Sequence, residues 1–273
     1  MSLIKRTFDT SVPLPSILPK RWGEEFVSND NVIFDSLDQF IFVVSKLTQK
    51  QDDYCDVTYE TALQDLIGKK GNLPEKEQDT IRNLVRSNLL KRGLITEEVY
   101  ESYRYTSDGT QVGVDVGKYA TGDPECVMSP TKRYIDFFYE LYVNISYPGG
   151  VPNENVKRNV AKLLATVEEL ERRHIFIKIN AVFPAEASGR DGRNFFSIIP
   201  IFSHKDPKSV SVMSSVINER LLRKFYFAVL EDFYGDDLSS GYGRAVNLTK
   251  TINIGSYLDE VEFFEEIVKE VGA

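Results

Sequence analysis

Apolar residues recur at helical spacing in three segments of the first hundred residues. Residues 35–46 carry them at i, i+3, i+4 and i+7, behind an Asp-Ser pair that can cap a helix. Residues 57–67 repeat the pattern more weakly, and residues 74–92 repeat it strongly, between a proline and Gly93. The stripe of this third segment consists of Ile81, Leu84, Val85 and Leu89. The pattern therefore predicts three helices.

The middle of the chain has the pattern of a β-α-β unit. Residues 137–146 combine aromatic and β-branched residues and predict a buried strand. Residues 152–174 predict a long amphipathic helix, and residues 175–183 a second strand. Such a unit favours parallel, right-handed pairing of its two strands. Residues 194–202 predict a third strand, and residues 208–234 are expected to be largely helical.

Composition indicates a soluble globular chain. Of 273 residues, 42% are hydrophobic and 27% charged, which excludes the disordered and collagen-like classes. Two cysteines, Cys55 and Cys126, and two histidines, His174 and His204, stand in separate segments, which argues against a structural zinc site and against disulfides. No apolar run has the length of a signal peptide or a membrane span. We therefore expect a cytosolic protein with no membrane partner and no cofactor.

The end of the first strand of the β-α-β unit is where open α/β sheets bind ligands. It reads Asn144-Ile145-Ser146-Tyr147-Pro148. The order of strand and helix resembles a von Willebrand A-type (vWA) domain, which carries Asp-x-Ser-x-Ser there as oxygen ligands for Mg²⁺. Here Asn144 replaces the aspartate and Pro148 the second serine, and these residues do not replace a carboxylate and a hydroxyl. The resemblance implies a vWA-like fold with a degenerate metal site, so we expect no bound metal.

The run DVGKYATGDPEC, residues 115–126, resembles a signature of a widespread family of phage-encoded proteins of unknown function. The resemblance spans residues 112–245 and implies a phage origin, a vWA-like core and a location in the host cytoplasm, without an agreed activity. Within the run, Gly122 and Pro124 are expected to form turns, and Cys126 to be a small buried residue. Further elements that match are residues 158–171, Leu222–Phe227 and Gly241–Gly243.

Together these patterns predict an α/β fold, with a degenerate vWA-like (Rossmann-like) sheet and a mostly helical N-terminal portion. We assign residues 1–100 to an N-terminal arm and helical portion. Three prolines predict that residues 1–30 form an irregular arm. Residues 101–250 are assigned to the vWA-like core, and residues 251–273 to an acidic C-terminal segment.

No set of catalytic residues emerges from the sequence. His174 ends the predicted helix and lies far along the chain from either cysteine. The chain has no G-x-x-x-x-G-K-[ST] motif, and no G-x-G-x-x-G motif opens a helix after a strand. The element Gly241-Tyr242-Gly243 is by itself a weak signal for phosphate binding. We therefore expect a binding protein and not an enzyme.

Basic and aromatic residues interleave at three places, a pattern typical of proteins that bind single strands through cations and stacked bases. Loops beside glycine are expected to be exposed, which favours the residues there. Two predicted helices add further candidates, although their rings also fit core packing and their cations a solvated helix face. The candidate contacts are Arg190, Arg193, Tyr242, Arg244, Arg220, Lys224, Arg82 and Arg86.

The negative charge is concentrated at one end of the chain. The formal net charge is -8, and residues 258–273 hold six acids and one lysine, which leaves -3 for the remainder. A basic patch elsewhere is compatible with this distribution. The acidic segment has apolar residues at helical spacing. It predicts either a docked terminal helix or a segment that competes with nucleic acid or recruits a partner.

We therefore expect a sequence-tolerant protein that binds single-stranded DNA as an accessory factor in phage transcription or replication. In size, acidity and tail it resembles a phage single-stranded-DNA-binding cofactor of RNA polymerase. Its partners would be single-stranded DNA and a phage RNA polymerase or replication protein, and self-association is left open. The alternative is a protein-interaction module of vWA-like fold that binds a phage or host protein. The lost metal ligands and the net charge favour this alternative.

Overall fold

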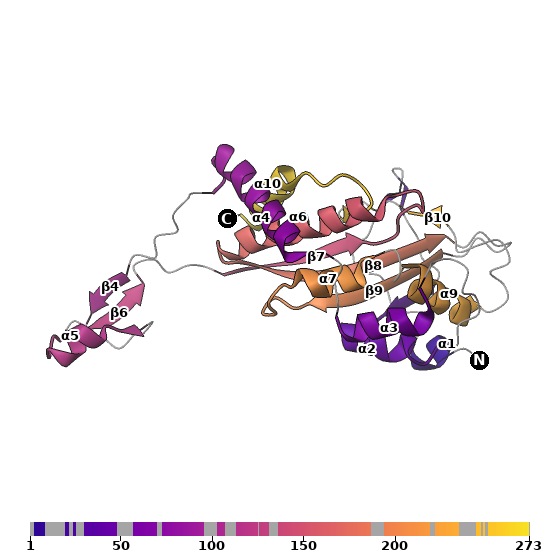
Figure 1. Ribbon diagram of the computed structural model, residues 1–273, viewed down its shortest axis with the longest axis horizontal. Coiled ribbons are helices and arrows are strands. Elements are labelled where there is room, and N and C mark those ends of the chain that lie inside the picture. Colours follow the sequence, from indigo (N-terminus) through magenta and orange to yellow (C-terminus); the bar gives the residue numbers. More distant parts are fainter. Residues whose placement is uncertain are drawn as a thin grey trace.

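The predicted β-α-β unit lies at the centre of the fold (Figure 1). β7 (Phe137–Asn144) and β8 (Ile175–Glu186) pair in parallel, with Phe137 opposite Ile175. α6 (Asn153–Glu171) forms the crossover between them. β9 (Asn194–Phe202) then returns antiparallel to β8, at the position of the third predicted strand. The α/β fold expected from the sequence is confirmed.

Segments from both ends of the chain complete the sheet, whose order is β11-β7-β8-β9-β3. β3 (Asp30–Ile33) pairs in parallel with β9, and β11 (Ile252–Asn253) in parallel with β7. β10 (Arg244–Ala245) pairs antiparallel with the end of β8. The computed structural model describes residues 3–8, 20–21, 24–25, 30–47, 57–69, 73–95, 103–106, 113–124, 126–130, 136–186, 194–218, 222–234, 244–246, 248 and 251–272. The N-terminal portion and the C-terminal segment thus share one sheet with the central residues.

The three N-terminal helices predicted from the sequence are present as α2 (Leu37–Val44), α3 (Tyr59–Ile67) and α4 (Glu75–Lys91). Ser36 caps α2 by accepting a hydrogen bond from the Gln39 amide at 3.2 Å. Along α4, Ile81, Val85 and Leu89 are buried, but Leu84 is 50% exposed. The inclusion of Leu84 in the buried stripe was wrong, because α4 packs mainly against α6 and α10 and buries only a narrow stripe.

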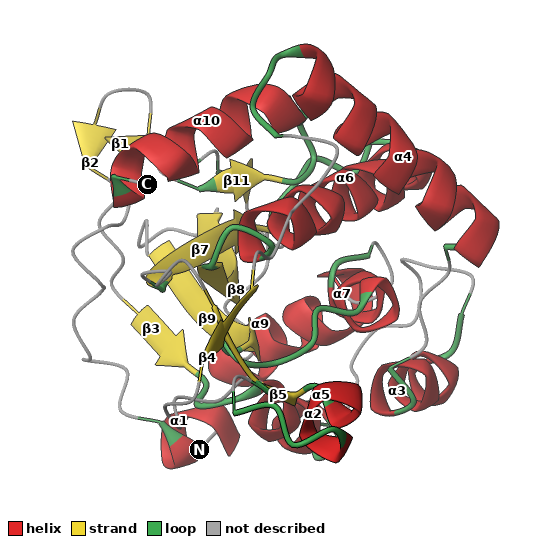
Figure 2. Ribbon diagram, turned by 90° about the vertical axis from the view of Figure 1, so that its left-hand side faces the viewer, coloured by secondary structure: helices red, strands yellow, loops and turns green. Residues whose placement is uncertain are grey.

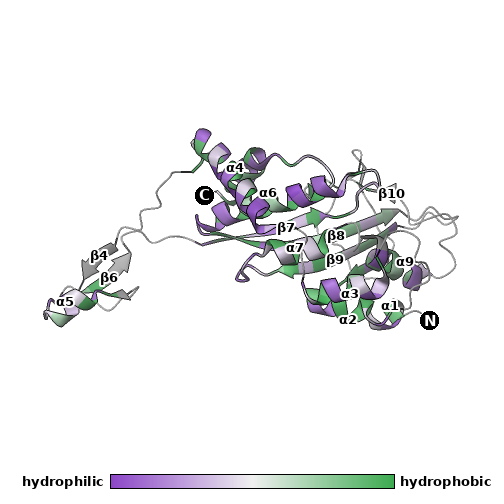
Figure 3. Ribbon diagram, viewed as in Figure 1, coloured by the Kyte–Doolittle hydropathy of each residue, from purple (hydrophilic) through white to green (hydrophobic). Residues whose placement is uncertain are grey.

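Apart from α5, the described helices gather on one face of the main sheet. Figure 2 shows α6, α7 (Val210–Val216) and α9 (Phe227–Tyr234) on the same side of β7, β8 and β9. Their apolar side chains join those of the sheet in one core. Along α6, hydrophobic and hydrophilic residues alternate with the turns of the helix (Figure 3), so one stripe faces this core. The opposite face carries a smaller apolar cluster that includes Val246 and Leu248.

The N-terminal arm is less irregular than its prolines predict. Residues 3–7 form α1 (Leu3–Thr7), and Ile4 is fully buried. The Ile4 amide donates to Asp232 Oδ2 of α9 at 2.9 Å. Two-residue strands β1 (Lys20–Arg21) and β2 (Glu24–Glu25) pair further along. The prediction of an irregular arm was wrong for residues 3–7, because a nonlocal contact with α9 stabilises a short helix there.

A second, small sheet lies apart from the main one (Figure 1). It consists of β4 (Tyr103–Thr106), β6 (Val127–Pro130) and β5 (Gly113–Val114), with α5 (Val116–Ala120) beside them. Asp115 caps α5, and Gly122 follows it with φ 75°, which confirms the turn expected there. Cys126 is half-buried.

The C-terminal segment ends in α10 (Glu260–Val271), which is docked on the body of the protein. Phe263, Phe264 and Ile267 are buried against α4, α6 and β7. Of the two alternatives for the acidic segment, the structure has the docked helix. Within the described ranges no helix combines the length and the apolar character that crossing a membrane requires.

Candidate functional site

The predicted basic loops fall largely outside the described part of the chain. The residues that lie outside the described part are Arg190, Arg193, Arg220 and Tyr242. Arg244 begins β10, and its Cα pairs with that of Glu186 at the end of β8. The fold therefore places the Arg244 backbone next to the end of β8, the last described residue before Arg190 and Arg193 in the sequence.

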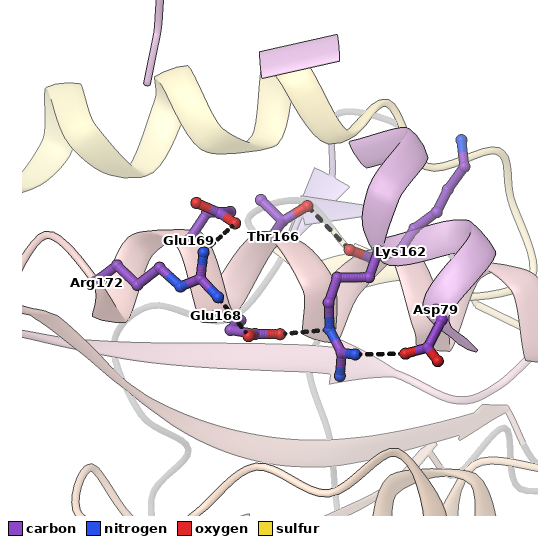
Figure 4. Close-up of polar contacts among 7 residues, drawn as sticks. Asp79, Lys162, Thr166, Glu168, Glu169 and Arg172 are labelled. Atoms are coloured by element: carbon purple, nitrogen blue, oxygen red, sulfur yellow. Dashed lines mark hydrogen bonds and ion pairs between the residues drawn. The ribbon is translucent and has the colours of Figure 1, made fainter. Parts of the chain in front are cut away.

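Arg82 of α4 faces another helix. Arg82 Nε lies 2.8 Å from Glu168 Oε2 of α6, and its Nη1 lies 2.8 Å from Asp79 Oδ1. Glu168 also accepts from Arg172, so the charges form a chain across the helix pair (Figure 4). Arg86 is half-buried on the same helix. Because the Arg82 guanidinium is matched by two carboxylates, α4 offers a weaker positive surface than its sequence predicts.

Lys224 does not reach the surface. It lies in η1 (Leu222–Tyr226), a turn of π-helix, and only 3% of the residue is exposed. Its neighbours Phe225 and Tyr226 are almost fully buried as well. The sequence was compatible with burial of the aromatic rings of this segment in the core. In the structure the lysine is buried together with them. Lys224 is therefore removed from the set of surface contacts.

An aromatic pair stands on the sheet face that the described helices leave uncovered. Phe138 of β7 and Phe176 of β8 are directly opposite each other in the parallel register. Their ring centroids are 5.9 Å apart and the rings are inclined by only 27°. Phe138 is 59% exposed and Phe176 is half-buried. We call these two rings the aromatic pair.

Both histidines of the chain flank the aromatic pair. The His204 ring meets Phe138 edge-on with centroids 5.2 Å apart, and the His174 ring lies 6.3 Å from that of Phe176. His174 has φ 62° where the chain turns from α6 into β8, and its Nδ1 lies 3.1 Å from Asp136 Oδ1. This corner of the sheet thus combines four planar rings, of which two can carry a positive charge.

Next to the aromatic pair, Lys178 forms an ion pair with Glu140 of the adjacent strand. Tyr142 also donates to Glu140 Oε2, at 2.9 Å. Burial raises the pKa of Glu140, but the hydrogen bonds from Lys178 and Tyr142 outweigh it and hold the pKa below its usual value. The Tyr142 pKa is raised, by burial first and then by Glu140. Glu140 is therefore a charged acceptor already engaged by its neighbours.

The carboxyl end of β7, where the resemblance to vWA domains would place a metal, is filled by hydrogen bonds. Asn144 Nδ2 donates to the Val246 carbonyl and to Asn253 Oδ1, both at 2.6 Å. Its Oδ1 accepts from the Ser146 amide at 2.9 Å. Among the described residues, no group of three or more His, Cys, Asp or Glu side chains is arranged to hold a metal. Asn144 thus ties β7 to the segment that covers this end of the sheet.

A family model described as a domain of unknown function (DUF7192) matches residues 24–272. The chain belongs to this family. The match takes in α2, α3, α4 and α10, which the phage resemblance over residues 112–245 did not include. No curated protein and no solved structure matches the chain. The DUF7192 domain therefore comprises the main sheet with its helices and the small second sheet.

The aromatic pair was missed by the sequence analysis, which assigned residues 137–146 to a buried strand. A usable signal was present, because Phe138 and Phe176 each occupy the second position of a predicted strand. Strands of a parallel β-α-β unit align their starts, and side chains alternate between faces, so the two rings were bound to share a face. What the sequence did not reveal was that no described helix covers that face.

Proposed function

We propose that the DUF7192 domain binds single-stranded DNA with little sequence preference, on the open face of its main sheet. The exposure of Phe138 beside Phe176 on a face without a described helix supports this most directly. An exposed phenylalanine loses the stabilisation that burial provides, about 1.5–3 kcal/mol. Base stacking on such rings contributes about 1–3 kcal/mol each and tolerates any base, because every base has a π-face.

Basic residues near the aromatic pair and at the far end of the sheet would bind the phosphates of the DNA backbone. Lys205 lies beside the strands that carry the aromatic pair, and Lys178, which is paired with Glu140, lies on β8. Arg244 stands at the other end of β8, the strand that precedes Arg190 and Arg193 in the sequence. The stretch from Phe176 to Glu186 spans about 33 Å at about 3.3 Å per residue. Between these ends Asn180 and Val182 are buried on the same face, so the DNA would contact β8 directly only at the corner that carries the aromatic pair.

Fluorescence anisotropy with labelled oligo-dT of about 16 nucleotides tests this proposal. Phe138→Ala is expected to weaken binding about tenfold, while Phe138→Trp retains it, because the larger ring also stacks. Phe42→Ala on α2 is the matched control, since Phe42 is 61% exposed on another surface. Failure of the unmodified protein to bind oligo-dT, or equal loss in the Phe42 and Phe138 variants, would contradict the proposal.

The accessory role in phage transcription or replication, with a phage RNA polymerase or replication protein as partner in the host cytoplasm, belongs to the same proposal. It rests on the phage resemblance. The parallel β7-α6-β8 order supports a vWA-like core of which the metal ligands are lost. Co-purification of the polymerase with the tagged protein from infected cells, retained after nuclease treatment, would be the expected result.

A further inference from the structure

A cleft of about 450 Å³ lies beside β7, bounded by the start of β11 and by α10. Its apolar wall comes from Leu141, Phe263 and Ile267, and its acidic wall from Glu140, Glu266 and Glu270. Among the described residues that line it there is no lysine, arginine or histidine, although Glu140 is paired with Lys178 and Glu270 accepts a hydrogen bond from the Tyr139 hydroxyl. A volume of this order is sufficient to take several side chains of a ligand.

The cleft runs along an open strand edge. β11 pairs only with Val143 and Asn144, so within the described chain the rest of β7 has a strand partner on one side only. The Phe137 amide donates to the His174 carbonyl on the β8 side, and the Asn144 carbonyl accepts from the Ile254 amide on the other side. The N–H and C=O groups of successive residues alternate in direction along a strand, so those of Phe138 and Glu140 point toward the open edge of β7.

We propose that this edge binds an extended basic peptide segment of a partner protein, which adds to β7 as a further strand. Main-chain hydrogen bonds to an exposed edge provide affinity in this mode of recognition, and alternate side chains provide specificity. Lysine or arginine side chains fit the α10 wall, because their aliphatic stems can lie on Phe263 and Ile267 while their charges meet Glu266 and Glu270. The peptide would use the backbone of Phe138 but not the rings of the aromatic pair, so this proposal stands without the nucleic-acid proposal.

A fluorescein-labelled peptide of about seven residues, in which lysine and valine alternate, is the probe. Binding is measured by anisotropy at about 0.15 M salt, where nonspecific charge attraction is largely screened. A peptide of the same sequence, N-methylated at alternate residues, retains the charge but loses the strand hydrogen bonds. We expect it to bind at least about tenfold more weakly.

Charge-reversal variants of α10 distinguish the contribution of the cleft to peptide binding from that of the rest of the acidic helix. E266K/E270K is expected to weaken binding of the lysine-valine peptide at least about tenfold. E262K/E265K, which makes the same change at exposed positions outside the cleft, should leave it unchanged. In the unmodified protein, the peptide should slow hydrogen exchange of the Phe138 and Glu140 amides. Absence of binding, equal binding of the N-methylated peptide, equal loss in both double variants, or unchanged exchange at these amides would each overturn the proposal.

Discussion

Lys162 Nζ lies 2.9 Å from Glu260 Oε2, and less than a tenth of either side chain is exposed. Lys162 belongs to α6, and Glu260 is the first residue of α10. Asn88 of α4 donates to the other carboxylate oxygen at 2.7 Å. One buried ion pair therefore fixes the start of the C-terminal helix at the point where three helices meet.

Removal of one partner of this pair is expected to be strongly destabilising. Glu260→Ala leaves the Lys162 ammonium buried without its counter-charge, which should lower the free energy of unfolding by about 3–5 kcal/mol. Urea unfolding checks this, with Glu265→Ala, an exposed acid of the same helix, as control. The double variant K162M/E260L should lose less free energy of unfolding than the K162M and E260L variants lose in sum. Additive losses would contradict a direct interaction between the two side chains.

The same pair predicts a dependence of stability on pH. Burial raises the pKa of Glu260, but hydrogen bonds from Lys162 and Asn88 and the lysine charge outweigh it, so the folded-state pKa lies below the ordinary 4.5. The stabilisation is therefore complete above that ordinary value and is lost as the pH falls through the lower folded-state pKa. The difference in unfolding free energy between the unmodified protein and Glu260→Gln should shrink on acidification. A difference that stays constant down to pH 3 would contradict this assignment.

The acidic helix is expected to act as part of the core. Phe264 is 1% exposed and packs in the main core, so Phe264→Ala should cost about 3–5 kcal/mol. Thermal unfolding checks the loss of stability. Below its melting temperature the variant should bind oligo-dT as the unmodified protein does, because α10 packs on the face of β7 opposite to the aromatic pair. A variant of unchanged stability but tighter DNA binding would instead support the competing-tail alternative.

Gly255 is expected to tolerate no side chain. A Cβ there would lie 2.4 Å from Tyr147 Cβ, and Tyr147 is buried. Gly255→Ala should therefore destabilise by about 1–3 kcal/mol through overpacking. Gly150→Ala is the control, because nothing lies within 4 Å of the corresponding Cβ. Equal melting temperatures of the two variants would show that the segment after β11 shifts without cost.

Local patterns predicted the elements well, and nonlocal contacts account for the rest. The stripe of α6 and the β-branched residues of β7 and β8 carry their structure in their own sequence, since spacing alone fixes which side is buried. The pairing of β3 with β9, which are more than a hundred residues apart, has no such local signal. Lys224 was misplaced for the same reason, because its burial depends on how η1 packs in the fold.

In the candidate site, too, features with a local sequence signal could be predicted and features that depend on nonlocal contacts could not. Arg82 could be identified as part of a basic face, but its partner Glu168 lies on another helix. The aromatic pair required both the parallel register and a sheet face over which no described helix lies. The first follows from the β-α-β pattern, whereas the second is a property of the assembled fold.

Photo-crosslinking with oligo-dT that carries 5-iododeoxyuridine tests the central proposal most directly, because the halogenated base forms bonds with the side chains on which it stacks. Mass spectrometry of the digested adduct identifies the residues. The proposed DNA interface predicts crosslinks at Phe138, Phe176 or His204, which disappear in the presence of excess unlabelled oligo-dT. Crosslinks confined to other surfaces, or none despite measurable binding, would contradict it.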